Sequence, residues 1–245
     1  FSKTMTDYLD QKQSIKQFYN NFPDMKGFAS QINEKKKSFD LATRLKLVTV
    51  LKDQYRNLAV TEATTENINS LENEETFTIT TVHQLNLFTV PLYFLYKIIS
   101  TINLTEMLAD QFPDQRFVPV FWMATEDHDF EEINYFNFKE EKVTWDRPNG
   151  GAVGRFSLEG LKEVHAHFSQ QLGDTKNAIF LSQLFEKAYV LHSNLADATR
   201  YIANELFKSY GLVILDADDQ RLKNIFAPVM KDELLYQTSK KAVSK

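Results

Sequence analysis

Residues 118–134 constrain the fold more than any other part of the sequence. They begin with a short apolar run, Val118 to Met123, that is rich in valine and aromatic residues, and the ionisable residues Glu126 to Asp129 follow almost at once. An apolar run of this length predicts a buried strand of a parallel sheet. Because ligands of open α/β sheets bind just beyond the carboxyl ends of such strands, the sequence predicts a functional site here.

Two further strands are predicted on similar grounds. Residues 77–81 form a β-branched run, and residues 212–215 form a second buried apolar run. A loop over 82–90 and a long helix, with Pro91 in its first turn, connect the strand at 77–81 to the strand at 117–123. The order strand, helix, strand predicts a right-handed parallel crossover and therefore an α/β fold.

Helical patterns flank and interrupt this predicted sheet. Apolar residues recur at three- and four-residue steps over 4–58, which predicts two or three amphipathic helices broken near Pro23 and Gly27. A weak helix and a polar link are expected over 61–75. The remaining expected elements are a hairpin over 135–146, a loop over 147–155, helices over 158–172, 176–192 and 195–209, the last capped by Asn194 and closed by Gly211, and a helix over 219–236.

Composition narrows the possible functions. The chain has 245 residues, of which 43% are hydrophobic and 25% charged, as expected for a soluble globular protein of one large or two small domains. It has no cysteine, which excludes disulfides, thiolate zinc sites and a cysteine nucleophile. A formal charge of −5 argues against sequence-independent binding of nucleic acid or anionic membranes. No signal peptide or membrane span is predicted, so a cytoplasmic protein is expected. Because the chain starts at Phe1 and stops just after an amphipathic run, a fragment of a longer protein is also expected.

Polar side chains follow each of the three predicted strands. Parallel strands bring their carboxyl ends to one edge of a sheet, so these side chains are expected to form one site. The helix that begins near Pro91 would add N–H groups and a partial positive charge, which suit a phosphate. The residues at the strand ends are His83 and Gln84, then Glu126, Asp127, His128 and Asp129, then Asp216, Asp218 and Asp219.

Several of these residues also have a purely structural interpretation. Asp127 and Asp129 are suited to capping a helix, and His128 to a structural hydrogen bond. Asp216 and Asp218 are suited to a turn. Three other histidines stand in polar helical segments and are expected on the surface: His165, His167 and His192.

A metal site is open to His83, His128 and the neighbouring carboxylates, which are ligands that zinc or magnesium accepts. No His-Glu-x-x-His pair accompanies them, so no metal is predicted. The sequence also lacks a Walker loop, a Gly-x-Gly-x-x-Gly motif and a Gly-x-Ser-x-Gly motif. The common nucleotide-binding and serine hydrolase signatures are therefore absent.

Five segments of the sequence resemble the BshC family, which is considered to supply the cysteine ligase of bacillithiol biosynthesis. The resemblance runs through most of the chain. The segments are TTVHQLNLFTVPLY at 80–93, PVFWMATEDHDFEEIN at 119–134, GAVGR at 151–155, LADATR at 195–200 and YGLVILDADD at 210–219.

The resemblance implies a Rossmann-like core related to class I aminoacyl-tRNA synthetases and nucleotidylyl transferases. It implies an N-terminal helical region packed on the core over 1–75, a first part of the core over 76–135, an inserted connective segment over 136–194 and a continuation of the core over 195–245. A dimerising coiled coil would lie beyond Lys245, so a homodimer is expected for the full-length protein.

The resemblance also implies a reaction. Cysteine would be added to glucosaminyl-malate after ATP-dependent activation of a carboxylate, with small molecules rather than nucleic acid or membrane as partners. His128 would relay a proton. By this resemblance, catalytic roles fall to His83, Asp127 and His128, nucleotide contacts to His83, Gln84, Asn86, Thr89, Asp216 and Asp218, and substrate contacts to Tyr93, Trp122, Glu126, Asp127, His128 and Asp129.

The sequence departs from the family pattern at three positions. Val82, Val90 and Lys208 stand where the family usually has glycine. Glycine permits positive φ and close approach of a phosphate, whereas valine resists both, which argues against tight nucleotide binding. Two rival hypotheses therefore stay open. One is a metal-dependent hydrolase that uses residues 126–129, and the other is a binding module without catalysis.

Overall fold

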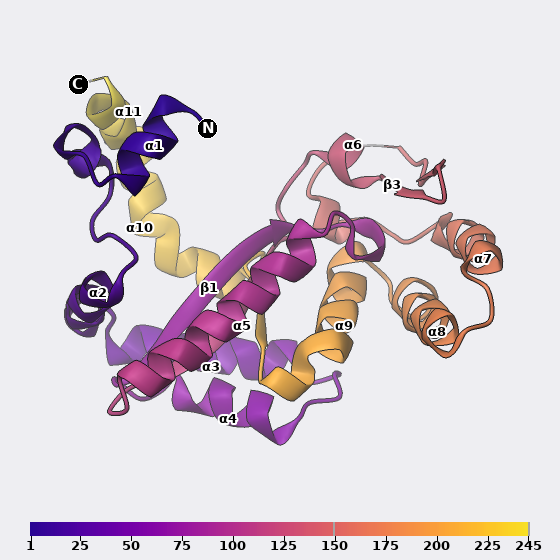
Figure 1. Cartoon of the computed structure of the whole chain (residues 1–245), viewed down its shortest axis with the longest axis horizontal. Coiled ribbons are helices and arrows are strands. Elements are labelled where there is room, and N and C mark those ends of the chain that lie inside the picture. The colour runs from indigo at the N-terminus through magenta and orange to yellow at the C-terminus, as the bar shows by residue number, and fades with distance from the viewer. Residues whose placement is uncertain (149, 245) are drawn as a thin grey trace.

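A parallel sheet lies at the centre of the computed structural model, which describes residues 1–148 and 150–244. Within these residues the sheet has three strands, in the order β1 (Thr76–Gln84), β2 (Arg116–Ala124) and β5 (Val213–Asp216). Helix α5 (Tyr93–Gln111) joins β1 to β2 and runs along β1 in Figure 1. The predicted α/β class and the parallel crossover are confirmed. Asn149, in the predicted loop 147–155, and Lys245, in the predicted last region, lie outside the described residues.

Helix α5 covers one face of the sheet through aromatic and aliphatic contacts. The ring of Phe94 meets Phe121 of β2 edge-on, with centroids 5.3 Å apart. At the other end of the helix, Leu108 packs with Phe77 and Phe117. These residues alternate with others along each strand, because successive side chains of a strand point to opposite faces. Burial of this face against α5 therefore fixes the register of β1 and β2.

The outer edge of β5 is completed by side chains from the end of α3 (Leu41–Gln54). The hydroxyl of Tyr55 accepts the Ile214 N–H at 2.7 Å. The Gln54 side chain accepts the Asp216 N–H at 3.0 Å and donates to the Asp216 carbonyl at 2.8 Å. An unpaired buried backbone group is unfavourable, so these two side chains take the place of a neighbouring strand.

Replacing Tyr55 by phenylalanine should lower the free energy of unfolding by about 1–3 kcal/mol at neutral pH, because it leaves the buried Ile214 N–H without its partner. Burial also raises the pKa of Tyr55 to about 12. The stability from its neutral phenol is complete below about pH 10, the value for an unfolded tyrosine, and is lost as pH rises towards 12. Urea unfolding of both proteins from pH 7 to 11 checks this. A variant that is as stable as the wild type at pH 7 and loses stability equally at pH 11 would contradict it.

The N-terminal helices are α1 (Lys3–Leu9), α2 (Met25–Ser38), α3 and α4 (Glu62–Ser70), with a 3₁₀ turn over Gln13–Phe18. The predicted break near Pro23 is confirmed, because Asp24 caps α2 by accepting the Gly27 N–H at 2.8 Å. The predicted break at Gly27 is wrong. Gly27 lies inside α2, where its backbone passes so close to Phe22 that a β-carbon would be 1.8 Å from the Phe22 carbonyl oxygen.

The segment between β2 and β5 begins with the short helix α6 (Phe130–Ile133) and the predicted hairpin of β3 (Tyr135–Phe138) and β4 (Glu141–Thr144). Helices α7 (Leu161–Leu172), α8 (Lys176–Leu191) and α9 (Leu195–Phe207) follow, and Asn194 caps α9 as predicted. The prediction of His165 as a surface residue is wrong. Its side chain lies between α7 and α8, where Nε2 is 2.9 Å from the Ser182 carbonyl oxygen.

Several element boundaries differ from the sequence-based expectation. Pairing with β2 continues to the end of β1, so His83 and Gln84 are strand residues rather than loop residues. Pro91 precedes the N-cap of α5 and is not in its first turn. Helix α10 (Gln220–Tyr236) is capped by Asp219, and the short α11 (Thr238–Val243) follows it. Within the described part of the chain, no helix has both the length and the apolar character needed to cross a membrane.

Candidate functional site at the carboxyl edge of the sheet

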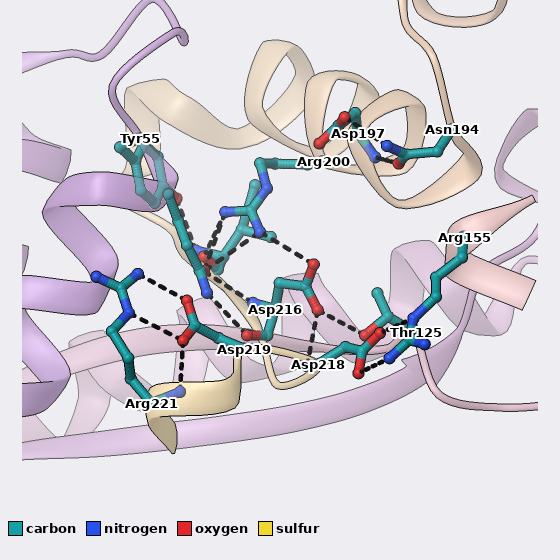
Figure 2. A network of polar contacts seen from close by, with 12 residues as sticks. Tyr55, Thr125, Arg155, Asn194, Asp197, Arg200, Asp216, Asp218, Asp219 and Arg221 are labelled. Carbon is teal, nitrogen blue, oxygen red and sulfur yellow. Dashed lines mark hydrogen bonds and ion pairs between the residues drawn. The ribbon is translucent and has the colours of Figure 1, made fainter. Parts of the chain in front are cut away.

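The ends of the three strands lie together at one edge of the sheet. The Thr125 hydroxyl, just after β2, donates to a carboxylate oxygen of Asp216 at the end of β5, at 2.6 Å, as Figure 2 shows. The Gln84 side chain, at the end of β1, donates to Glu132 at 3.0 Å. The expected convergence of polar side chains at this edge is therefore present.

Asp127 shapes the loop after β2 through its own backbone. Its Oδ1 accepts the N–H groups of His128 at 2.7 Å and of Asp129 at 3.1 Å. Burial by itself raises the pKa of Asp127, but hydrogen bonds from Asp129 N–H, Gln84 and His128 N–H outweigh it, and the pKa lies below its ordinary value. Asp129 is the N-cap residue of α6, but its side chain makes no capping bond. Neither residue therefore caps a helix through its side chain as expected, but Asp127 has a structural role in the loop before α6.

His128 and Asp129 point towards solvent. Their side chains are 81% and 52% exposed, with the nearest nitrogen and oxygen 3.7 Å apart. The ligand atoms that these two residues and Asp127 offer lie within 4.8 Å of one another. Three neighbouring exposed groups, one of them already bonded to its own backbone, form a poor metal site compared with enclosed sites that have oriented ligands.

Asp216 stands on a buried polar network. Arg200 of α9, whose residue surface is 5% exposed, has a guanidinium nitrogen 3.7 Å from Asp216 Oδ2. Both terminal nitrogens of Arg200 also donate to the Gln54 side-chain oxygen at 3.2 Å. Burial lowers the pKa of Arg200, and the Asp216 charge opposes that change. Figure 2 shows Arg200 and Asp216 lying across from each other below α9.

A second, more exposed network joins the segment between β2 and β5 to the residues after β5 and to α10. Arg155 binds both carboxylate oxygens of Asp218, at 2.7 and 2.8 Å. Lys223 binds Asp218 as well, and it pairs with Glu126 at 2.6 Å. The hydrogen bonds from Arg155 lower the pKa of Asp218, while burial opposes this and Lys223 adds to it. Glu126 and Asp218, two predicted site residues, are thereby linked through Lys223.

The loop before Arg155 lies directly on the end of β2. The Val153 N–H donates to the Asp127 carbonyl at 2.8 Å, and the Gly154 N–H donates to the Thr125 carbonyl at 2.9 Å. A β-carbon on Gly154 would be 2.8 Å from both the β-carbon and the carbonyl oxygen of Thr125. Only glycine permits this approach without a shift of the backbone.

Replacing Gly154 by alanine should therefore lower the free energy of unfolding by about 1–3 kcal/mol, as overpacking does elsewhere. Chemical denaturation measures the change. Ser157→Ala, at an exposed position nearby, is the control and should change the free energy by less than about 0.5 kcal/mol. Equal stability of Gly154→Ala and the wild type would show that the loop does not press on Thr125.

The β1 side of the edge contains His83 and a tightly held loop. His83 Nδ1 lies 3.1 Å from the Gln84 carbonyl oxygen, which only accepts, so Nδ1 donates and Nε2 is the basic nitrogen of the neutral ring. The His83 ring meets Phe94 in the first turn of α5. Phe88 and Thr89 adopt φ of 51° and 62°. The Phe88 N–H donates to the Tyr189 hydroxyl at 2.9 Å.

Burial of Phe88 holds this loop in its unusual conformation. Its ring packs within 5.0 Å, between centroids, of four other aromatic rings. The rings around Phe88 are Phe136, Phe168, Phe185 and Tyr189.

Nearby, Asn86 is 6% exposed, and its side-chain oxygen has no hydrogen-bond partner among the described residues.

The departures from glycine introduce no backbone strain. Val82 lies inside β1 and pairs with Trp122 of β2. Val90 has extended backbone at φ −99° and ψ 138°. Lys208 has right-handed helical backbone at φ −57°. None of the three residues has the positive φ that favours glycine, so the expected backbone conflict does not arise. Val82 and Val90 are 47% and 37% exposed.

Trp122 and His83 lie on opposite faces of the sheet. Alternation along the strands places Trp122 on the face of the sheet opposite α5, whereas His83 packs against α5. Trp122 lines a cavity of about 540 Å³ between the sheet, α3 and α10, together with Glu126 and Lys223. Tyr93 is 68% exposed at the start of α5. The predicted substrate residues therefore surround the edge from both faces rather than forming one compact pocket.

Sequence reasoning missed five residues that hold this edge together. Arg200 carried a usable signal, because a charged residue on the apolar stripe of a helix indicates a buried ion pair. Arg155 lies in the GAVGR segment but was given no role. Gln54, Thr125 and Lys223 carried no signal, since each acts through a partner distant in sequence or through an ordinary hydroxyl or amine.

These features define an α/β protein with a Rossmann-like parallel sheet and a polar site at its carboxyl edge. The sequence profile described as bacillithiol biosynthesis BshC, N-terminal Rossmann-like domain, matches residues 1–245, and the chain belongs to this family. The relatives from Flavobacterium johnsoniae and Christiangramia forsetii are 58% and 53% identical over 99% and 98% of this chain. Both carry the name "Putative cysteine ligase BshC". The chain spans 46% of the length of each, about half of these relatives.

Proposed function

We propose that the full-length protein joins cysteine to glucosaminyl-malate to form bacillithiol, after ATP activates the cysteine carboxylate. The observation that carries this proposal is the match of the whole chain to the BshC family. The site supports it, because polar side chains from three strand ends meet where open α/β sheets bind their ligands. A homodimer and a cytoplasmic location are proposed on the same family relation.

The chemistry assigns separate tasks to the two sides of the edge. A cysteine carboxylate oxygen attacks ATP, forming an aminoacyl adenylate and releasing pyrophosphate. The amine of glucosaminyl-malate then attacks the carbonyl carbon, an amide bond forms, AMP leaves and the amine loses a proton. His83, Gln84, Asn86 and Thr89 would bind the nucleotide beside the start of α5, as helix N-termini favour phosphate. Asp218 would also contribute from the β5 side, once released from Arg155 and Lys223.

The acidic loop after β2 suits the amine. Asp127 has a pKa below its ordinary value, so it is ionised at neutral pH and attracts an ammonium group. His128, exposed beside it, can accept the proton that the attacking amine loses. Glu126, Asp129, Tyr93 and Trp122 would contact the rest of the substrates.

The residues present fit ATP as a co-substrate on one specific ground. The side-chain oxygen of Asn86 is buried and accepts no hydrogen bond from the described residues. A buried polar atom without a partner is unfavourable, so a ligand N–H group such as the adenine amino group would be stabilised there. Because Phe88 holds the adjacent loop rigidly, little ordering is needed on binding.

The test supplies the full-length protein with ATP, cysteine and glucosaminyl-malate and searches for bacillithiol by mass spectrometry. Product that requires all three compounds supports the proposal. Product without ATP refutes the activation step, and no product under any condition refutes the ligase. In that case, stabilisation by zinc or manganese alone would favour the metal-dependent hydrolase, and no binding of metal, nucleotide or cysteine would favour the binding module.

A further inference from the structure

The carboxylate of Asp216 is surrounded by partners from its own chain. Oδ1 accepts the Thr125 hydroxyl at 2.6 Å and the Asp218 N–H at 3.0 Å, while Oδ2 faces Arg200 at 3.7 Å. Figure 2 shows these partners on both sides of the carboxylate. A nucleotide that bound this group would compete with Thr125, the Asp218 N–H and Arg200 for the carboxylate oxygens.

Thr125 connects Asp216 to the acidic loop of residues 126–129. Its residue surface is 1% exposed, and it immediately precedes Glu126. Its hydroxyl is fixed by Asp216, and its carbonyl accepts the Gly154 N–H at 2.9 Å. The Val153 N–H donates to the carbonyl of Asp127 in the same loop, at 2.8 Å. Thr125 is therefore the point at which β2, β5 and the inserted segment meet.

Arg200 and Gln54 hold Asp216 in place from beneath. Gln54 binds both the N–H and the carbonyl of Asp216, at 3.0 and 2.8 Å, and its oxygen also accepts from Arg200 at 3.2 Å. A buried guanidinium is stable only while it is paired and hydrogen-bonded. These contacts restrict both the backbone and the side chain of Asp216.

We propose that Asp216 is a positioning residue, which acts through the Thr125 hydroxyl to fix the loop of Glu126 to Asp129 for binding of the amine-bearing substrate. The inference deepens the proposed function and rests on it for the identity of the substrate. The positioning itself rests on the hydrogen bonds from Thr125, Arg200 and Gln54.

The test compares Thr125→Val with Thr125→Ser in the full-length protein. Valine keeps the shape of threonine without the hydroxyl, and serine keeps the hydroxyl. We expect Thr125→Val to lower kcat/KM for the amine-bearing substrate about tenfold or more, because the loop both binds the amine and, through His128, accepts its proton. Thr125→Ser keeps the hydroxyl that bonds Asp216, so the loop should stay in place and kcat/KM should stay within about threefold of the wild type. A shift of the loop by about 1 Å would be enough to reduce activity.

Hydrogen exchange supplies a second readout that does not depend on activity. In Thr125→Val, the amides of residues 126–130, 153 and 154 should exchange about tenfold faster, while those of α7 and α8 stay unchanged. Unchanged exchange in this loop overturns the positioning role. Faster exchange with unchanged KM and kcat overturns its consequence for binding. If the wild type forms no product, the proposed function fails, and the exchange comparison still decides whether Thr125 and Asp216 hold the loop.

Discussion

Replacing Asp127 by asparagine in the full-length protein should lower kcat/KM for bacillithiol formation by about 10- to 150-fold, because a hydrogen bond to a charged group contributes about 1.5–3 kcal/mol. Asparagine keeps the shape of the side chain and still accepts the N–H groups of His128 and Asp129. The loop should therefore persist, and the loss should come from the missing negative charge. Product formation followed by mass spectrometry gives the rates.

The ionised state of Asp127 and a control variant together separate the effect of its negative charge from the effect of its side-chain shape. Because the Asp127 pKa is lowered, the wild type keeps its ionised form from neutral pH down to below the ordinary carboxyl range. Glu131→Gln, on the exposed side of α6, removes a nearby charge outside the site and should change kcat/KM by less than about threefold. Equal activity of Asp127→Asn and Glu131→Gln would show that Asp127 does not contact the substrate amine.

The second large effect is expected in stability. Asp216→Asn removes the counter-charge of the buried Arg200 and should lower the free energy of unfolding by about 2–3 kcal/mol. Breaking a fully buried ion pair costs about 3–5 kcal/mol. The expected loss is smaller here because the Asp216 side chain is 23% exposed and lies 3.7 Å from the guanidinium. Denaturant unfolding at neutral pH measures the difference.

A double variant distinguishes an unpaired charge from simple loss of contacts. In Asp216→Asn with Arg200→Met, no buried cation remains, so the double variant should be more stable than Asp216→Asn alone. The coupling between the two sites is obtained from a double-mutant cycle. Additive effects of the two substitutions would contradict the ion pair between Asp216 and Arg200.

Much of the fold could be predicted because it follows from local patterns. The apolar runs of β2 and β5 and the β-branched run of β1 are short and rich in strand-forming residues, and the long helix between β1 and β2 indicates a parallel crossover. The boundaries were less certain. His83 and Gln84 belong to β1 because Met123 and Ala124 continue to pair with them, which no local signal shows.

The candidate site was predictable in place but not in its internal partners. Parallel strands oblige Thr125 and Asp216 to lie near one another once both strand ends are known. The pairing of Arg200 with Gln54 joins residues 146 positions apart, so it depends on how α3 and α9 pack. The prediction for His165 was wrong for the same reason, because its side chain is buried by contacts with α8, which is distant in the sequence. Tertiary packing, rather than sequence pattern, assigned these roles.

The central claim is that this edge of the sheet activates the carboxylate of cysteine with ATP. Cysteine labelled with ¹⁸O in its carboxylate tests the claim most directly. The adenylate route transfers one carboxylate oxygen to AMP when the amide forms, so the account predicts ¹⁸O in AMP, in step with bacillithiol, from the full-length protein. Bacillithiol that accumulates while AMP carries no ¹⁸O would contradict it.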